Sequence, residues 1–143
     1  MRQIRTGVFE TNSSSVHSIC IAKEKTIPDK SITFMIGDYG WEIDTVNVPD
    51  YLYTGILLQD DHKELLAKLK RMLDRMNISY KFQTPMWDSY SNGEIYLDNG
   101  SIDHSEDVRE FIDAVLNDDN MLMRALFHPD SVVYTGNDNI SWN

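Results

Sequence analysis

The stretch "DDHKELLAKLKRMLDRMN", residues Asp60 to Asn77, decides the fold, because it has the clearest helical period in the chain. Its apolar residues recur at i, i+1, i+4, i+7, i+8 and i+11, which places them on one face of a helix with about 3.6 residues per turn. Asp61 followed by Glu64 predicts a capping-box-like start, with Asp in place of Ser or Thr. His62 lies in the first turn, where we expect it to be solvated. A stripe of Leu and Met at this spacing is typical of a helix that faces a core.

The sequence on either side of this helix predicts short strands and further helices. Strands are expected at residues 14–22, 31–36, 42–48, 80–83, 93–100 and 131–134, the third of them ended by Pro49, and turns are expected at Asn92-Gly93 and Asn99-Gly100. Additional helices are expected at residues 106–117 and 120–127. Strands first, followed by helices interleaved with strands, favour an α+β fold. We therefore predict a single domain over residues 1–143, with a small mixed or antiparallel sheet and two to three helices.

Length and composition fit one globular protein of the cytoplasm. A chain of 143 residues, 41% of them hydrophobic, is long enough to bury one core. No apolar run approaches the ~20 residues that span a bilayer, and "MRQIRTGVFE" lacks the apolar stretch of a signal peptide. A lone cysteine forms no internal disulfide. We therefore expect a cytoplasmic protein that has no membrane partner.

The negative charge of the chain is concentrated in its last part. Residues 1–81 carry 11 acidic and 11 basic side chains, whereas residues 82–143 carry 12 acidic side chains and two arginines, Arg109 and Arg124. The formal net charge of −10 therefore comes entirely from residues 82–143. Such a field repels the phosphates of nucleic acids and attracts basic protein surfaces. We expect a protein partner with a basic surface and no direct contact with nucleic acid; the alternative is that the acidity serves solubility alone.

Two pairs of metal-ligating residues stand out. His17 and Cys20 lie three residues apart in "HSIC", and Asp103 and His104 are adjacent in "SIDHSED". Zinc takes about four N, S or O donors, and these residue types are its usual ligands. In a regular strand His17 and Cys20 point to opposite faces, so both reach one ion only where the backbone turns or bulges. The sequence predicts one structural zinc ion (Zn2+) held by these four residues; the alternative is a buried Cys20 beside a hydrogen-bonded strand histidine.

Two polar segments leave an enzyme open as an alternative. "ETNSSSVHS", residues 10–18, contains a carboxylate, serines and a histidine, the residue types of a nucleophilic triad. "TGNDN", residues 135–139, has the composition of a metal or phosphate loop. Neither has the spacing of a nucleophile elbow, a P-loop or an EF-hand, and Ser and Asn at such positions are also typical of turns. A hydrolase or transferase would require the two segments to meet in space.

Three segments resemble a group of uncharacterised small proteins from phages and prophages of Gram-positive bacteria. They are "RTGVFETNSSSVHSICI", "IDHSE" and "SVVYTGNDN". The resemblance is weaker between these segments, and it implies a phage or prophage origin without implying a chemistry. In that setting, a small acidic cytoplasmic protein is similar in character to the type II-A anti-CRISPR proteins. This similarity is at the level of the class, because these inhibitors share no common sequence motif.

The similarity to anti-CRISPR proteins implies a partner and a mechanism. Some of these inhibitors bind the RNA-guided nuclease and keep target DNA out of its basic channel, and at least one contains zinc. In this chain Glu106, Glu110, Asp113 and Asp118 are expected along and just after the helix at 106–117, where they would contact Lys and Arg side chains that otherwise hold phosphates. The expectation is a non-enzymatic, phage-encoded inhibitor that binds a host type II CRISPR nuclease. The alternatives are the enzyme described above and a metal-free acidic DNA mimic.

Overall fold

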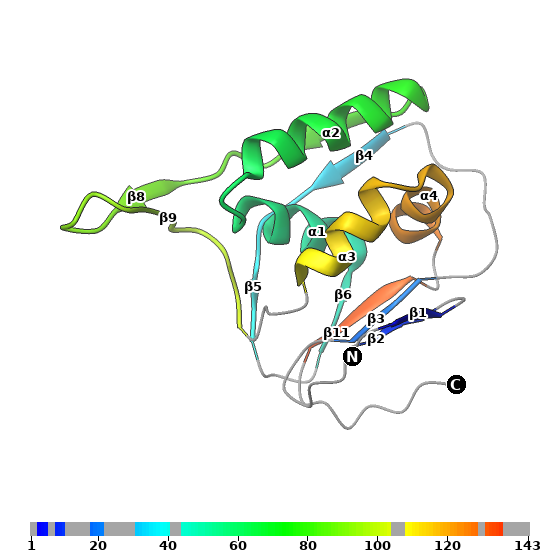
Figure 1. The fold of residues 1–143 in the computed structure, drawn as a ribbon, viewed down its shortest axis with the longest axis horizontal. Helices are drawn as coiled ribbons and strands as arrows, with labels where there is room; N and C mark the ends of the chain where they lie inside the picture. The colour runs from blue at the N-terminus through cyan, green and yellow to red at the C-terminus, as the bar shows by residue number, and fades with distance from the viewer. Residues whose placement is uncertain are drawn as a thin grey trace.

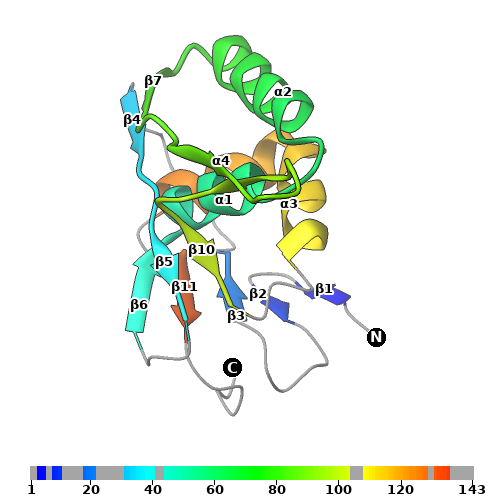
Figure 2. The same ribbon diagram turned by 90° about the vertical axis from the view of Figure 1, so that its left-hand side faces the viewer.

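A five-stranded antiparallel sheet forms one side of the protein, and helices are stacked above it (Figures 1 and 2). The computed structural model describes residues 3–5, 8–10, 18–21, 31–40, 44–103, 108–128 and 131–135. The strands of the sheet are, in spatial order, β1 (Gln3–Arg5), β2 (Val8–Glu10), β3 (Ser18–Cys20), β11 (Val132–Thr135) and β6 (Asp44–Asn47). The helices in the described part of the chain are α1 (Val48–Leu57), α2 (His62–Arg75), α3 (Val108–Leu116) and α4 (Asp119–Phe127). None of these helices has the length and apolar character needed to cross a membrane.

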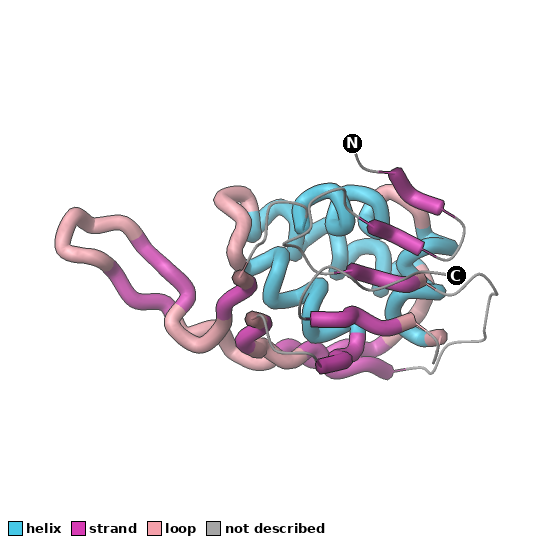
Figure 3. Tube along the Cα trace, turned by 90° about the horizontal axis from the view of Figure 1, so that it is seen from below, coloured by secondary structure: helices cyan, strands magenta, loops and turns pink. Residues whose placement is uncertain are grey.

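Three pairs of short strands lie outside this sheet. They are the parallel pair β4 (Ser31–Phe34) and β7 (Ser79–Phe82), the parallel pair β5 (Asp38–Tyr39) and β10 (Ser101–Ile102), and the antiparallel pair β8 (Trp87–Ser89) and β9 (Ile95–Leu97). β8 and β9 form a hairpin that projects away from the body of the protein in two perpendicular views (Figures 1 and 3).

α1 is the centre of the fold. Its sequence, "VPDYLYTGIL", contains nine buried residues out of ten. It contacts α2, α3 and α4 as well as β4, β6, β10 and β11, and Figure 2 shows it between α2 and the sheet. A helix with apolar residues on all sides is typical of a core.

The sequence predicts a strand that extends to Val48 and is ended by Pro49, and the structure corrects this. β6 ends at Asn47 and α1 begins at Val48. Pro49 therefore lies in the first turn of a helix, where the N–H group that proline lacks would have no helical partner in any case. The proline thus starts a helix as well as ending a strand.

Aromatic side chains fill the space around α1. Tyr51 and Tyr53 of α1, Phe34 of β4 and Phe111 of α3 are all fully buried. The ring of Tyr53 lies 6.1 Å from that of Phe34 and 4.9 Å from that of Phe82 of β7. The ring of Tyr51 lies 6.3 Å from that of Phe111. Pairs of this kind contribute about 0.5–1.5 kcal/mol each beyond the burial of their area, so α1 is held to β4, β7 and α3 by ring contacts.

Polar atoms of α1 fix the chain that joins β4 to β5. The N–H of Met35 donates to Oδ1 of Asp50 at 2.9 Å, and the N–H of Gly37 donates to Oγ1 of Thr54 at 3.1 Å. Buried or half-buried backbone donors need such partners wherever no strand neighbour supplies one. The connection after β4 is therefore positioned by side chains of the central helix.

α2 confirms the helix predicted from the period of residues 60–77. Its buried residues are Leu65, Leu69, Met72 and Leu73. Asn77 follows the helix with φ of 62°, in the left-handed region that Asn tolerates better than most residues. The N–H of Asn77 donates to the carbonyl of Asp74 at 3.0 Å, and the N–H of Ile78 donates to that of Leu73 at 2.9 Å. This is the Schellman arrangement, which satisfies the last carbonyl groups of a helix.

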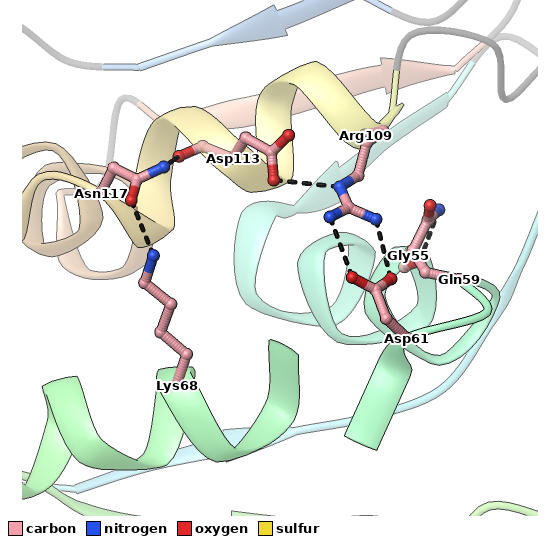
Figure 4. A network of polar contacts seen from close by, with 7 residues as sticks. All are labelled: Gly55, Gln59, Asp61, Lys68, Arg109, Asp113 and Asn117. Atoms are coloured by element: carbon pink, nitrogen blue, oxygen red, sulfur yellow. Dashed lines mark hydrogen bonds and ion pairs between the residues drawn. The ribbon is translucent and has the colours of Figure 1, made fainter. Parts of the chain in front are cut away.

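The start of α2 differs from the capping box predicted at Asp61. Asp61 occupies the N-cap position, but its carboxylate makes no hydrogen bond to the first N–H groups of the helix. Instead, it accepts two hydrogen bonds from Arg109 of α3, at 2.8 and 3.0 Å (Figure 4). Further along the two helices, Nζ of Lys68 donates to Oδ1 of Asn117 at 2.7 Å. These contacts hold α2 against α3.

The structure confirms the α+β class. The helices predicted at 106–117 and 120–127 correspond to α3 and α4, with residues 104–107 outside the described part of the chain. The six predicted strands overlap β3, β4, β6, β7, β9 and β11. The described residues contain four helices where the sequence predicts two to three, and the additional helix is α1.

Candidate functional site

The β8–β9 hairpin, termed the arm and spanning residues 84–99, is built around the turn that the sequence predicts at Asn92-Gly93. The N–H of Tyr90 donates to the carbonyl of Glu94 at 2.7 Å, and the N–H of Gly93 donates to that of Tyr90 at 2.9 Å. Gly93 has φ of 91°, a conformation that strains any residue with a Cβ. Oδ1 of Asn92 accepts from the N–H of Glu94 at 3.0 Å. Local turn chemistry therefore fixes the tip of the arm.

The root of the arm is closed by hydrogen bonds across the two strands. The N–H of Asp98 donates to the carbonyl of Met86 at 2.7 Å. The N–H of Met86 donates to Oδ1 of Asn99 at 2.9 Å, and Nδ2 of Asn99 donates to the carbonyl of Thr84 at 3.4 Å. The arm therefore leaves the body as a closed two-stranded element.

Every residue from Met86 to Ile95 is exposed. Four of them are large and apolar: Met86 is 57% exposed, Trp87 40%, Tyr90 56% and Ile95 71%. Soluble monomers rarely expose contiguous apolar surface beyond a few hundred Å². Met, Trp and Tyr are enriched at protein–protein interfaces. The arm therefore has the composition of a binding surface.

The arm is also acidic. Residues 83–103 contain Asp88, Glu94, Asp98 and Asp103 and no Lys, Arg or His. Tyr96 lies opposite Asp88 in the strand pair, and the negative charge of Asp88 is the main reason that the pKa of the Tyr96 phenol is raised. A negative field of this kind attracts cationic side chains.

A cleft of about 530 Å³ lies where the arm joins the body. One wall is the connection from α1 to α2, between residues 57 and 63, and the other consists of Trp87 and residues 95–97. The rings of His62 and Trp87 are stacked, with centroids 4.8 Å apart and planes at 30°. Nδ1 of His62 lies 3.1 Å from the carbonyl of Gln59. The sequence predicts a solvated His62, and the structure corrects this, because His62 is half-buried against the arm.

Two residues of the predicted acidic face, Asp113 and Asp118, have hydrogen-bond partners within the protein. Asp113 accepts from Nε of Arg109 at 3.0 Å. Asp118 is the N-cap of α4, and its Oδ1 accepts two hydrogen bonds from backbone N–H groups of the first turn, at 2.9 and 3.2 Å. Glu110 is half-buried, and Glu106 lies outside the described residues. Partner binding through these four residues stays a prediction, with Asp113 and Asp118 already engaged within the protein.

The described residues do not test the predicted zinc site. His17 and His104 lie outside them, and of Cys20 only the backbone is described, in β3. Asp103 follows β10 with an exposed side chain, and its N–H donates to the carbonyl of Tyr39 at 2.8 Å. Among the described side chains, no group of three or more His, Cys, Asp or Glu could hold a metal ion. The zinc site stays a prediction.

The register of the sheet bears on the two polar segments. β3 and β11 are antiparallel neighbours with Ser18 opposite Tyr134, so β3 begins at the end of the sheet where β11 ends. Phe9 of β2 pairs with Ile19, which places Glu10 at the same end. "ETNSSSVHS" and "TGNDN" therefore both start from described residues at one end of the sheet, while residues 11–17 and 136–139 lie outside the described part.

The sequence predicts the turn and the charge of the arm but not its exposed apolar side chains. The available signal is a run of bulky residues, "MWDSYSNGEIY", that has no helical period and carries charges of one sign only. No family model, no curated protein and no solved structure matches this chain. Its function is therefore inferred from the residues of the arm and the cleft.

Proposed function

We propose that this protein acts by binding a protein partner with a basic surface, and that the arm is the contacting element. The observation that supports this is the unbroken exposure of residues 86–95, which hold four large apolar side chains and carboxylates but no cation. Large aromatic side chains are the residues that contribute most to binding at interfaces, often by about 2 kcal/mol or more each. The carboxylates accelerate and orient the encounter with a cationic surface.

The first partner to test is a host type II CRISPR nuclease, in the cytoplasm of the host. This choice follows from the resemblance to phage proteins and from the class-level similarity to anti-CRISPR proteins. The nuclease holds its guide–target heteroduplex in a positively charged channel. An acidic arm with exposed apolar side chains is suited to such a channel. An arm bound in the channel would block the loading of target DNA.

Binding to the purified nuclease–guide RNA complex tests this proposal. The variant W87A/Y90A/I95A removes three exposed side chains of the arm and should weaken binding at least ~100-fold, because truncation of a side chain that dominates an interface costs about 2 kcal/mol or more. M35A is the matched control, because Met35 is an exposed apolar residue (46%) that follows β4 directly and lies outside the arm. Equal affinity of the parent and the arm variant would refute the proposal, and so would the absence of any complex with the parent.

Charge reversal separates the arm from the acidic face of α3. D88K/E94K should slow association and reduce the dependence of affinity on salt, whereas E64K, on the exposed side of α2, should have little effect. The same measurement on E106K/E110K tests the α3 version of the interface. A loss with the second pair alone would move the binding surface from the arm to α3.

An enzyme is the second candidate, and the register of the sheet is the observation that favours it. Strand ends that flank "ETNSSSVHS" and "TGNDN" lie at one end of the sheet, as a site formed by both segments requires. Alanine substitution of Ser14 and His17 should abolish inhibition of the nuclease in host cells if turnover is responsible, and should leave it unchanged if the arm acts by binding.

A further inference from the structure

The cleft at the root of the arm is apolar both inside and at its mouth. Buried Leu57 and Leu97 line it. So do three side chains that are open to solvent, Leu58 (37% exposed), Trp87 and Ile95. Covering such surface is favourable by about 25 cal/mol per Å². The volume of the cleft, about 530 Å³, lies within the range of roughly 300–1,000 Å³ that is typical of ligand sites. The cleft is therefore large enough for an aromatic side chain.

Trp87 is held in place by the protein itself. One face of its ring is stacked on His62, which is in turn held 3.1 Å from the carbonyl of Gln59. Its backbone is paired with Leu97 in the strand ladder. A side chain that is already fixed loses little conformational entropy on binding. Trp87 is therefore a preorganised wall for an incoming side chain.

The surroundings of the cleft are predominantly acidic. Asp60 lines it, and the arm, which forms its other wall, carries Asp88, Glu94 and Asp98 and no cation. Lys63 is the single Lys or Arg among the residues that line the cleft. An apolar side chain that arrives between Lys or Arg residues therefore meets complementary charge on the protein.

We infer that this cleft is the anchor site for one large apolar side chain of the partner, carried on a segment rich in Lys and Arg. The inference rests on the proposed function and specifies the chemistry that the arm recognises. This side chain of the partner packs against Trp87 and Leu58, and the cations on either side of it are attracted by Asp60 and by the carboxylates of the arm. The exposed tip of the arm, with Tyr90 and Glu94, then contacts the partner beyond the anchor.

A titration followed by ¹H–¹⁵N NMR tests the chemistry of the site. The probe is the amidated peptide Lys-Arg-Trp-Leu-Lys-Arg, and its effect on the indole N–H of Trp87, assigned with the variant W87F, is measured in the full chain. The controls are Lys-Arg-Ala-Ala-Lys-Arg and Glu-Glu-Trp-Leu-Glu-Glu. We expect saturable shifts of Trp87 and Leu58 with the first peptide and at least ~tenfold weaker binding of both controls. Equal binding of either control, the same shifts with free indole alone, or shifts that depend on protein concentration without any peptide would each overturn the inference.

The variant L58K tests the site within the complete protein. It places a cationic chain at the mouth of the cleft and should weaken binding of the peptide and of the partner at least ~tenfold. M35K introduces a lysine at an exposed apolar residue that does not line the cleft, and it should change neither. Because Leu58 and Met35 are both exposed, the spectra of both variants should otherwise match that of the parent. If L58K binds the partner normally while W87A/Y90A/I95A does not, the anchor site is wrong and the proposed function stands; if neither variant loses affinity, both are wrong.

Discussion

Replacing Gly55 with alanine tests the packing at the centre of the fold. A Cβ on Gly55 would lie 2.7 Å from Cγ1 of Val108 on α3, and 3.5 and 3.7 Å from Cδ1 atoms of Ile112 and Ile102. A separation of 2.7 Å is shorter than the closest approach of two non-bonded carbon atoms. α1 and α3 are therefore as close as they are because residue 55 has no side chain, and a methyl group there must displace the side chain of Val108 or one of the two helices.

Two opposing effects set the size of the change in the free energy of unfolding. Alanine stabilises a helix interior by about 0.8–1.0 kcal/mol relative to glycine, whereas an added group in a well-packed core costs about 1–3 kcal/mol. We therefore expect G55A to lower the free energy of unfolding by about 0–2 kcal/mol. In G55A/V108A the new methyl group enters space vacated by Val108, so the double variant should be about 1–2 kcal/mol more stable than the sum of the single effects predicts.

Urea unfolding followed by circular dichroism measures all three variants, and A67G supplies the helix-propensity term. Ala67 is on the exposed side of α2, so its replacement by glycine should cost about 1 kcal/mol without any packing effect. If G55A were more stable than the parent by as much as A67G is less stable, and if its effect did not depend on V108A, the close approach of α1 and α3 would be refuted.

Three further predictions concern ionisable groups and zinc. Arg109 holds the pKa of the Asp61 carboxyl below its ordinary 3.8. The contact therefore stabilises the fold above that pH, and this stabilisation is lost as the pH falls through the lower pKa of the folded state. In urea unfolding, R109M should be less stable than the parent at neutral pH and equal to it in strong acid. Burial raises the pKa of Tyr39 to about 12 and raises that of Tyr51 further. Because these phenols ionise more readily in the unfolded chain, the free energy of unfolding should fall as the pH rises above 10. An absorbance titration should then show a second group of tyrosines that ionises only when the protein unfolds. Elemental analysis should find about one zinc per chain, lost in C20S, and a parent protein that is metal-free and keeps its melting temperature in a chelator would contradict the zinc site.

The difference between α1 and α2 shows which helices a sequence reveals. α2 has one buried face and one charged face, so its apolar residues repeat with the helical period and its bounds follow from residues 60–77. α1 is buried on all sides, and a helix without a polar face produces no period. Pro49 then suggests the end of a strand, although proline is equally at home in the first turn of a helix.

The acidic face illustrates a second limit. Residues 82–143 do carry the excess of negative charge, as counted from the sequence. The pairing of Arg109 with Asp61, 48 positions away, is a tertiary contact that no local pattern predicts. Asp113 shares the same guanidinium group. A row of carboxylates in the sequence is therefore not yet a free acidic surface, whereas the arm combines carboxylates with four large apolar side chains that are exposed.

The composition of the arm is not explained by the needs of folding. Between residues 84 and 99, Leu97 is the one residue that belongs to the buried core. The apolar side chains of Tyr90 and Ile95 therefore stabilise the body little, while their exposure favours aggregation unless a partner covers them. At the same time, the backbone of the arm is fixed at its root by Asn99 and at its tip by the Asn92-Gly93 turn, and the ring of Trp87 is stacked on His62. Preorganisation of this kind lowers the entropic cost of association, and we therefore propose a role in recognition for the arm.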